Sequence, residues 1–456
     1  VGMHFNGTVK STAIDVECNN VIGGCIGFVY NGVTGDMHSA GNVLDEESGS
    51  TYDYNAYGGV VGRYYVGLIT DSDSTSTVIG QNYCGGIIGD LLEVDCKNCH
   101  YNGNKISGLN SVGGLIGCDC VTTITDCSVN CEFVRGRLCV GGFLGSSSPA
   151  KVNNCYAIIS DKVIADIETD YDIPGYVGGF VGYSCGDMSD CKVTVGGVET
   201  TGSYAGGFSG SLYGEPDVKY SVKNCSCEVG SVTSGYGAGG FSGSIDYITV
   251  LNCKAKVNGN IVTTTYDPNI EADFTRSYNG GFAATTGYQT VIAFCSTEFD
   301  SVICDGYNYA GGFAGSSWYS NLSNCYAKGN VVRCAVIGGG LIGSGTLYLN
   351  NCYTTVKVES EGSTVGEIIG YLYRPGEPHS CFSLGKNGSI NTVGDTNSVY
   401  GELYKEPNGY MPSSDWGSHP WSEDVWNLDT GSTPNLPTLK ENPPFNISDY
   451  PCPDPY

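Results

Sequence analysis

The feature that most constrains this chain is a five-residue block, Gly-Gly-x-x-Gly, that recurs along most of its length. The shortest intervals between blocks are 27 and 28 residues, and the longer intervals are this length plus an insertion. A fixed period of this size is typical of a solenoid, in which each repeat stacks on the next. Complete blocks begin at Gly23, Gly58, Gly85, Gly113, Gly141, Gly178, Gly206, Gly239, Gly311 and Gly339, and degenerate copies begin at Gly280 and Gly366.

Cysteine recurs in phase with the glycine pairs. Nine of ten such cysteines lie 13–15 residues after the opening glycine of their block, and Cys225 lies 19 residues after it. The corresponding sites before them read Met3, Met37 and Ser72. Because a free thiol behaves as a small apolar group, we expect a buried ladder of reduced thiols, with disulfides along the ladder as the alternative. Its members are Cys99, Cys127, Cys155, Cys191, Cys225, Cys253, Cys295, Cys325, Cys352 and Cys381.

The third position of the block carries phenylalanine in six successive repeats. Rings that recur at the spacing of paired strands bury a large area and stack on one another, so they predict a second ladder in the core. Its members are Phe143, Phe180, Phe208, Phe241, Phe282 and Phe313.

The residues between the blocks are typical of short β-strands. Runs with alternating apolar residues, such as 324–332, are separated by Gly, Asn and Ser, which favour turns. A repeat of 27–28 residues leaves no room for the helix of a βαβ unit. The sequence therefore predicts an all-β fold, a parallel β-solenoid (β-helix) of about 12 coils of 27–28 residues.

These same residues carry a family resemblance. Gly-Gly-Phe-Val-Gly (178–182), Gly-Gly-Leu-Ile-Gly (113–117 and 339–343) and Asn-Cys-Tyr-Ala (154–157 and 324–327) resemble the GLUG-motif repeat. The segment with Trp426-Asn-Leu-Asp and Pro434-Asn-Leu-Pro is similar to the one that often ends GLUG arrays. The resemblance implies a secreted or surface-attached repeat protein, as in bacterial adhesins and in arrays beside surface peptidases. It implies no catalytic residues.

The charge balance narrows the possible partners. The chain has 47 acidic and 21 basic side chains, a formal net charge of -26, so phosphate backbones and anionic lipid heads would repel it. We find no catalytic signature such as His-Glu-x-x-His or Gly-x-Ser-x-Gly. We therefore expect a non-enzymatic protein at the cell surface or outside the cell, an adhesin stalk or a self-associating filament subunit with a host protein, matrix protein or glycan as partner. The alternative is a carbohydrate-acting β-helix enzyme or an auxiliary repeat domain of a surface peptidase.

Three insertions, at 43–57, 161–176 and 262–278, leave the repeat between the in-phase position and the next glycine pair. Insertions on one face are where solenoids place their binding sites, so their tyrosines predict an interaction face. No cofactor is expected, with the possible exception of Ca²⁺. Acidic side chains of the second insertion could supply the oxygen ligands that Ca²⁺ requires. The alternative is that the three insertions are solvated loops without a ligand. The tyrosines are Tyr52, Tyr54, Tyr57, Tyr171, Tyr176, Tyr266 and Tyr278, and the Ca²⁺ candidates are Asp166, Glu168, Asp170 and Asp172.

Two further metal sites are weighed. Cys96 and Cys99, with Cys118 and Cys120 of the next coil, have a spacing that a tetrathiolate zinc site could use. Cys99 belongs to the inward ladder, and a turn that binds zinc would break that ladder. We therefore favour a buried, reduced thiol at Cys99 over a zinc ligand. His4 and His38 each follow an in-phase position and could stack on neighbouring coils, as a solvated row or a surface metal pair.

The C-terminal part differs in composition. Ten of the 16 prolines and three of the four tryptophans lie after residue 400. We expect the solenoid over 1–384, a cap over 385–442 in which Trp416, Trp421 and Trp426 cover the last coil, and an extended, proline-rich tail over 443–456. The first coil, near Gly7 to Val9, shows no such cap, which suggests end-to-end association with the C-terminal region of another copy.

Overall fold

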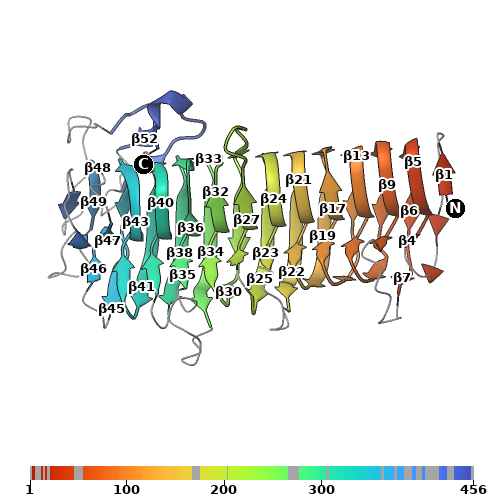
Figure 1. Cartoon of the computed structure of the whole chain (residues 1–456), viewed down its shortest axis with the longest axis horizontal. Helices are drawn as coiled ribbons and strands as arrows, with labels where there is room; N and C mark the ends of the chain where they lie inside the picture. Colours follow the sequence, from red (N-terminus) through yellow and green to blue (C-terminus); the bar gives the residue numbers. More distant parts are fainter. Residues whose placement is uncertain are drawn as a thin grey trace. The chain divides into compact units, whose positions relative to one another are not determined.

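The fold is known from a computed structural model, in which the chain divides into two compact units. The first unit comprises Val1–Tyr213 and Cys225–Gly230, and the second comprises Gly214–Asn224 and Ser231–Tyr456. Each unit is a stack of parallel β-strands, so the predicted all-β, parallel β-solenoid fold is confirmed (Figure 1). Among the described residues, no helix is long and apolar enough to cross a membrane. The structure describes residues 3–5, 12–13, 16–17, 21–45, 55–166, 175–202, 204–264, 277–304, 308–360, 364–373, 377–384, 393–396, 403–405, 421–428 and 436–452.

The glycine pairs end a row of three-residue strands that pair in parallel and in register within each unit. Gly58, for example, pairs with Gly23 on one side and with Gly85 on the other. In the first unit the row is β4 (Val21–Gly23), β8 (Ala56–Gly58), β12 (Tyr83–Gly85), β16 (Ser111–Gly113), β20 (Cys139–Gly141), β23 (Tyr176–Gly178) and β26 (Tyr204–Gly206). In the second unit it is β31 (Gly237–Gly239), β35 (Tyr278–Gly280), β39 (Tyr309–Gly311), β42 (Ile337–Gly339) and β46 (Thr364–Gly366).

The two glycines of a pair are required for different reasons. A Cβ on Gly58 would lie 1.9 Å from the carbonyl oxygen of Val61, three residues on in the same turn. A Cβ on Gly59 would lie 2.0 Å from the carbonyl oxygen of Gly86, in the next coil. The first glycine therefore permits the tight turn, and the second permits the close approach of neighbouring coils.

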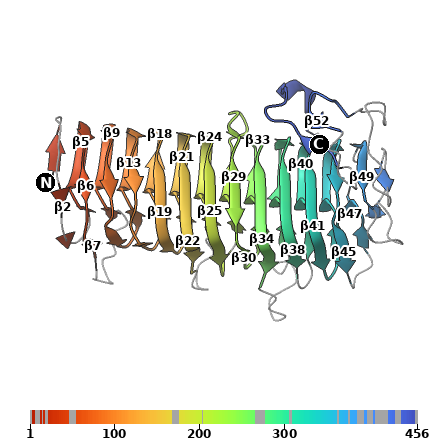
Figure 2. The same ribbon diagram turned by 180° about the vertical axis from the view of Figure 1, so that it is seen from behind.

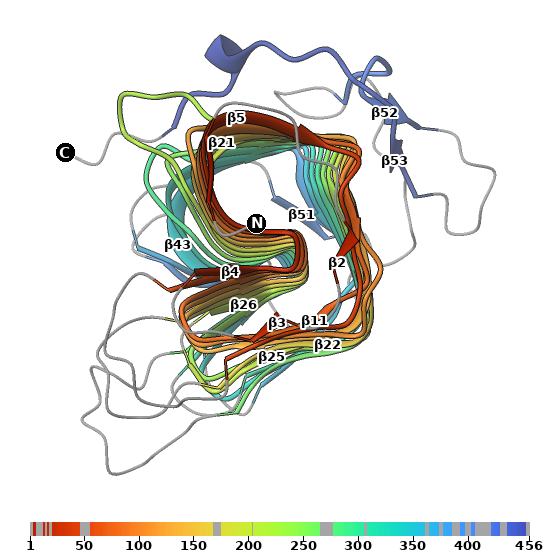
Figure 3. The same ribbon diagram turned by 90° about the vertical axis from the view of Figure 1, so that its right-hand side faces the viewer.

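Two further sheets complete each coil, on other sides of its outline (Figure 3). The first unit has β1 (Met3–Phe5), β5 (Ile26–Gly35), β9 (Val61–Thr70), β13 (Ile88–Lys97), β17 (Ile116–Cys120), β18 (Thr122–Thr125), β21 (Leu144–Asn153), β24 (Val181–Ser189) and β27 (Ser209–Tyr213) in one sheet. Its other sheet holds β2 (Thr12–Ala13), β3 (Val16–Glu17), β6 (His38–Ser39), β7 (Asn42–Leu44), β10 (Asp73–Ser74), β11 (Thr77–Ile79), β14 (His100–Tyr101), β15 (Lys105–Ser107), β19 (Ser128–Gly136), β22 (Tyr156–Ala165), β25 (Lys192–Thr200) and β29 (Ser226–Val229).

The second unit repeats this plan. One sheet holds β28 (Ser221–Lys223), β32 (Ser242–Asp246), β33 (Thr249–Leu251), β36 (Ala283–Thr286), β37 (Val291–Ala293), β40 (Ala314–Ser323), β43 (Ile342–Asn350), β47 (Ile369–Leu372), β48 (Glu377–His379) and β50 (Val393–Thr396). The other holds β30 (Val232–Ser234), β34 (Lys254–Thr263), β38 (Ser296–Cys304), β41 (Tyr326–Cys334), β44 (Tyr353–Thr354), β45 (Lys357–Ser360), β49 (Cys381–Ser383) and β51 (Leu403–Lys405).

The structure places all six phenylalanines of the predicted ladder in the core. In the first unit the rings of Phe143 and Phe180 stack with their centroids 4.6 Å apart, and those of Phe180 and Phe208 stack at 4.9 Å. In the second unit Phe282 stacks on Phe241 and on Phe313, both at 4.8 Å. These separations equal the spacing of neighbouring strands, because each ring continues the register of its coil.

All ten in-phase cysteines are buried and none is in a disulfide. Each follows a residue in the left-handed backbone region, as in Asn154 with a φ of 51° before Cys155. Asn and Asp tolerate this conformation best, which explains the Asn-Cys pairs of the sequence. The thiol then turns inward and donates to the carbonyl two residues before it, over 3.2 Å from Cys155 Sγ to Asn153 O. Cysteine thus fills an apolar position and satisfies a carbonyl at the corner of the coil.

The start of the first unit corrects two expectations. Met3 lies in β1 and pairs with Phe28, so it is not equivalent to Met37, which is buried at the corner before β6. His4 pairs with Val29, and the residue in register with His38 is Thr12, so the two histidines do not share a row. His38 instead contacts Asp73 of the next coil through Nδ1 and Oδ1. The segment from Gly7 to Val9 lies outside the described residues.

The predicted end of the solenoid at residue 384 is too early. Strand β50 pairs in parallel with β47, and β51 pairs in parallel with β49, so strands of a further coil extend to Lys405. Backbone pairing continues there although the glycine pair and the in-phase cysteine are lost, and of the block only the closing glycine remains, as Gly394. Trp416 of the predicted cap lies outside the described residues.

Candidate functional site

The C-terminal segment of the second unit packs against the side of the coils (Figure 2). It contains β52 (Trp426–Asn427), β53 (Thr438–Leu439) and the 3-10 helix η1 (Ile447–Asp449), and β52 pairs antiparallel with β53. We call residues 421–428 and 436–452 the clasp. The expectations of a cap over the last coil and of an extended tail are therefore wrong, because the clasp covers an apolar side of several successive coils.

Two tryptophans anchor the clasp on an outward row of aromatic rings. The row consists of Tyr326, Tyr353 and Phe382, each directly after an in-phase cysteine, and its rings stack at 5.0 and 5.2 Å. Trp421 lies 5.4 Å from the ring of Phe382, and Trp426 lies 6.0 Å from that of Tyr353. Both indoles are fully buried and both donate hydrogen bonds, one to Ser380 O and one to Asn324 Oδ1, each over 3.0 Å. The contacts therefore combine aromatic burial with directed hydrogen bonds.

Phe294 anchors the other end of the clasp. It precedes Cys295 and has a φ of 58°, a conformation that costs a bulky residue energy and that Asn324 and Asn351 occupy in the next coils. Its ring is 1% exposed and meets Phe445 and Tyr450 edge to face, at 6.2 and 6.0 Å. Burial against the clasp offsets the backbone strain.

A cavity of about 400 Å³ lies where the clasp crosses the coils. Its walls contain amide, hydroxyl, phenol and imidazole groups, together with one carboxylate and the apolar surface of the side chains that carry them. The lining residues are Asn321, Ser323, Asn324, Tyr348, Asn350, Asn351, His379, Asp449, Tyr450 and Pro451. We call it the lateral pocket.

A change in the outward side chains of successive coils creates the lateral pocket. Val291 and Ala293 pair with Asn321 and Ser323 in the next coil, so polar groups replace apolar ones at the same register positions. Ser323 in turn pairs with Asn350. The sequence shows that apolar residues give way to polar ones in these coils, which could have indicated a polar site. Only the strand register shows that the polar residues lie side by side.

Hydrogen bonds fix the geometry of the lateral pocket. Asn321 Nδ2 donates to Pro451 O over 2.7 Å, and Ser323 Oγ donates to Asn321 Oδ1 over 2.5 Å. Burial raises the pKa of the Tyr450 phenol to about 12, and neighbouring Asp449 adds to the rise, so this group is a neutral donor at pH 7. The Oδ1 atom of Asn351 is buried and accepts no hydrogen bond from the described part of the chain. Because this oxygen is fully buried, it is not itself open to the pocket, and the donors and acceptors of the pocket come from its other lining amides and from Tyr450.

Three tyrosines of the predicted interaction face are among the described residues. Tyr57 is fully buried and its hydroxyl donates to Asp45, so it is not an interaction residue. Tyr176 and Tyr278 are half-buried and stack on Tyr204 and Tyr309 at 6.1 and 5.4 Å. Tyr57 directly precedes a glycine pair, whereas Tyr176 and Tyr278 lie one residue earlier, and in a strand one residue reverses the face. Tyr52, Tyr54, Tyr171 and Tyr266 lie outside the described residues.

Of the four Ca²⁺ candidates, only Asp166 is described, and it forms an ion pair with Arg135. Glu168, Asp170 and Asp172 lie outside the described residues. The four cysteines weighed as an alternative zinc set do not come together. Among the described residues, the group of metal-ligating side chains that lie together is Cys96, Cys99 and Cys127, without Cys118 or Cys120.

Comparison with known proteins identifies one repeat. Residues 306–332 match the family model of the GLUG motif. The chain carries a GLUG motif. This confirms the resemblance read from the sequence, and the matched residues include Phe313 of the ring ladder and Cys325 of the thiol ladder. Neither a curated protein nor a solved structure gives a significant match to the chain.

Proposed function

We propose that this GLUG-motif protein is a non-enzymatic, extracellular adhesin whose solenoid is a stalk and whose lateral pocket binds a neutral glycan. The observation that carries the proposal is the chemistry of that pocket. Sugar hydroxyls both donate and accept hydrogen bonds, as do the amides of Asn321, Asn350 and Asn351. The rings of Tyr348 and Tyr450 offer apolar surface for the C–H face of a sugar.

Charge supports a neutral ligand. The chain carries a formal net charge of -26, and among the described residues that line the lateral pocket there is one carboxylate, Asp449, and no lysine or arginine. Such a field repels sulfated or phosphorylated ligands. A folded repeat stack with a lateral pocket of this chemistry suits the role of a stalk that presents a binding site.

The test is binding of neutral oligosaccharides, measured by calorimetry on the full chain. Asn351→Gly removes an amide side chain that lines the lateral pocket, and glycine accepts the φ of 50° without strain. Asn252→Gly is the matched control, because Asn252 has a φ of 51° at the equivalent corner, outside the lateral pocket. We expect Asn351→Gly to weaken binding by about tenfold, the loss of one to two hydrogen bonds, and Asn252→Gly to leave it unchanged. Equal affinities in the two variants, or no binding by the parent chain, would refute the glycan site.

A filament subunit is the second candidate. Tyr30 and Val33 of β5 are 47% and 51% exposed, an apolar surface that a second copy could cover. Electron microscopy of native material separates the two roles, since filaments are expected for a self-associating subunit and isolated stalks for an adhesin. Val33→Lys should shorten filaments if β5 is the contact, and filaments of unchanged length would exclude that surface.

A carbohydrate-acting enzyme, or an auxiliary domain of one, is the further alternative. It is favoured by the imidazole of His379 and the carboxylate of Asp449, which both line the same pocket. Product analysis after incubation with the bound oligosaccharide distinguishes the cases. Intact sugar is expected for an adhesin, whereas cleavage that Asp449→Asn abolishes would assign the enzyme.

A further inference from the structure

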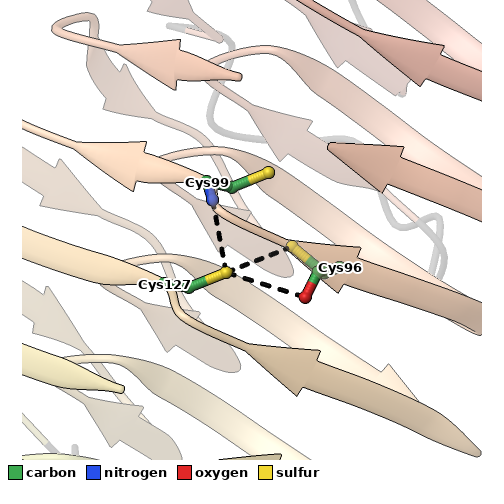
Figure 4. Close-up of side chains that lie close together, drawn as sticks. All are labelled: Cys96, Cys99 and Cys127. Carbon is green, nitrogen blue, oxygen red and sulfur yellow. Dashed lines mark hydrogen bonds between the residues drawn. The ribbon is translucent and has the colours of Figure 1, made fainter. Parts of the chain in front are cut away.

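Three sulfur atoms meet in the core of the first unit, far in sequence from the lateral pocket (Figure 4). Cys99 and Cys127 are successive members of the thiol ladder, and Cys96 is the inward residue near the end of β13. All three residues have 0% exposure. The three Sγ atoms lie within 4.8 Å of one another, and those of Cys96 and Cys127 are 3.9 Å apart.

Cys96 makes this place different from the rest of the ladder. Its partners in register in the adjacent coils are Ile69 and Ile124. An aliphatic side chain therefore fills the same site in both neighbours, whereas here a third sulfur joins two ladder thiols. Packing alone does not require sulfur at this position.

The separations suit a metal ion with three sulfur ligands. A metal–sulfur bond of about 2.3 Å places three ligands in a plane about 4 Å apart. The sulfur atoms of Cys96 and Cys127 are already 3.9 Å apart, and that of Cys99 lies within 4.8 Å of both, so a small rotation of its side chain would complete the set. Zinc requires a fourth ligand in tetrahedral geometry. The next ladder cysteine, Cys155, does not join the three, and Cys118 and Cys120 of β17 are also outside the group. Soft thiolate ligands in low coordination select Cu(I) among the biological metals.

We propose that Cys96, Cys99 and Cys127 bind one Cu(I) ion through three sulfur atoms. Copper–sulfur bonds replace thiol S–H bonds, and the released protons pass to solvent, while the copper remains in the +1 state. The backbone N–H of Cys99 already donates to Cys127 Sγ over 3.4 Å, which stabilises negative charge on that sulfur. The dry, apolar surroundings then protect the ion from oxidation and exchange.

Copper content and sulfur coordination test the site in the full chain. The protein is purified without oxygen from copper-supplemented cells, challenged with an excess of a Cu(I) chelator, and analysed for metal by mass spectrometry. Cys96→Ile removes one ligand and restores the residue of both neighbouring coils, so the fold is retained. Cys84→Val is the matched control, because it removes a fully buried thiol whose partner in the next coil is Val112.

We expect the parent chain and Cys84→Val to retain one copper per chain, and Cys96→Ile to retain about tenfold less. X-ray absorption of the retained copper should show three sulfur neighbours at about 2.3 Å. Circular dichroism verifies that Cys96→Ile keeps the β-sheet content of the parent. Equal retention by Cys96→Ile, loss of copper from the parent chain, or coordination by nitrogen or oxygen would each overturn the proposal.

Discussion

The stacked rings of the first unit make a prediction about its stability. Phe180 is fully buried between Phe143 and Phe208, with ring centroids 4.6 and 4.9 Å away and interplanar angles of 8°. Phe180→Ala removes the ring and both stacking contacts and leaves a cavity that adjacent coils, fixed by their register, cannot close. We expect a loss of about 3–5 kcal/mol in the free energy of unfolding of these coils.

Hydrogen exchange is the appropriate assay, because long repeat stacks do not unfold in two states and a loss of stability is confined to nearby coils. Amides of β20, β23 and β26 should exchange about 10³-fold faster in Phe180→Ala, the equivalent of about 4 kcal/mol. Phe180→Leu is the control, since Leu115 occupies the same block position, and it should cost about 1 kcal/mol. A cost below about 1 kcal/mol for alanine, or equal costs for both variants, would refute the ring ladder as a source of stability.

Three further predictions concern the clasp, a buried acid and the thiols. Trp421→Ala, which removes a fully buried indole and its bond to Ser380 O, should release the clasp to limited proteolysis while the exchange of the coils stays unchanged; equal protease resistance would contradict its anchoring role. Burial raises the pKa of Asp119 to about 7 from 3.8, so between these pH values the folded chain keeps a proton that the unfolded chain loses. The free energy of unfolding of the surrounding coils should therefore fall by up to about 4 kcal/mol as the pH rises through this window, and hydrogen exchange of the amides of β17, corrected for the intrinsic pH dependence of exchange, should show no such fall in Asp119→Asn. Cys155 and Cys325 should resist alkylation in the native protein and react fully after denaturation without reductant; their recovery as disulfides would contradict the thiol ladder.

The fold could be predicted because its determinants repeat. A glycine pair acts on its own turn and on the coil one repeat away, and an Asn-Cys pair sets a corner and directs a thiol inward. Because these local requirements recur at a constant period, the spacing of glycine and cysteine in the sequence is enough to detect the repeat. They fail where one residue matters, as at Tyr57, because in a strand a shift of a single position exchanges the buried and exposed faces.

The sequence by itself determined the coil, its period and the two core ladders, since these depend on contacts that recur with the repeat. The tertiary structure alone decided where the C-terminal segment lies and what it encloses. Trp426 bonds to Asn324 across 102 residues, and Asn321 bonds to Pro451 across 130 residues. Contacts of this kind occur once, so no periodic signal marks them, and the lateral pocket follows from the register of coils that first had to form. The sulfur cluster has the same origin, because Cys96 meets Cys127 only when two coils stack.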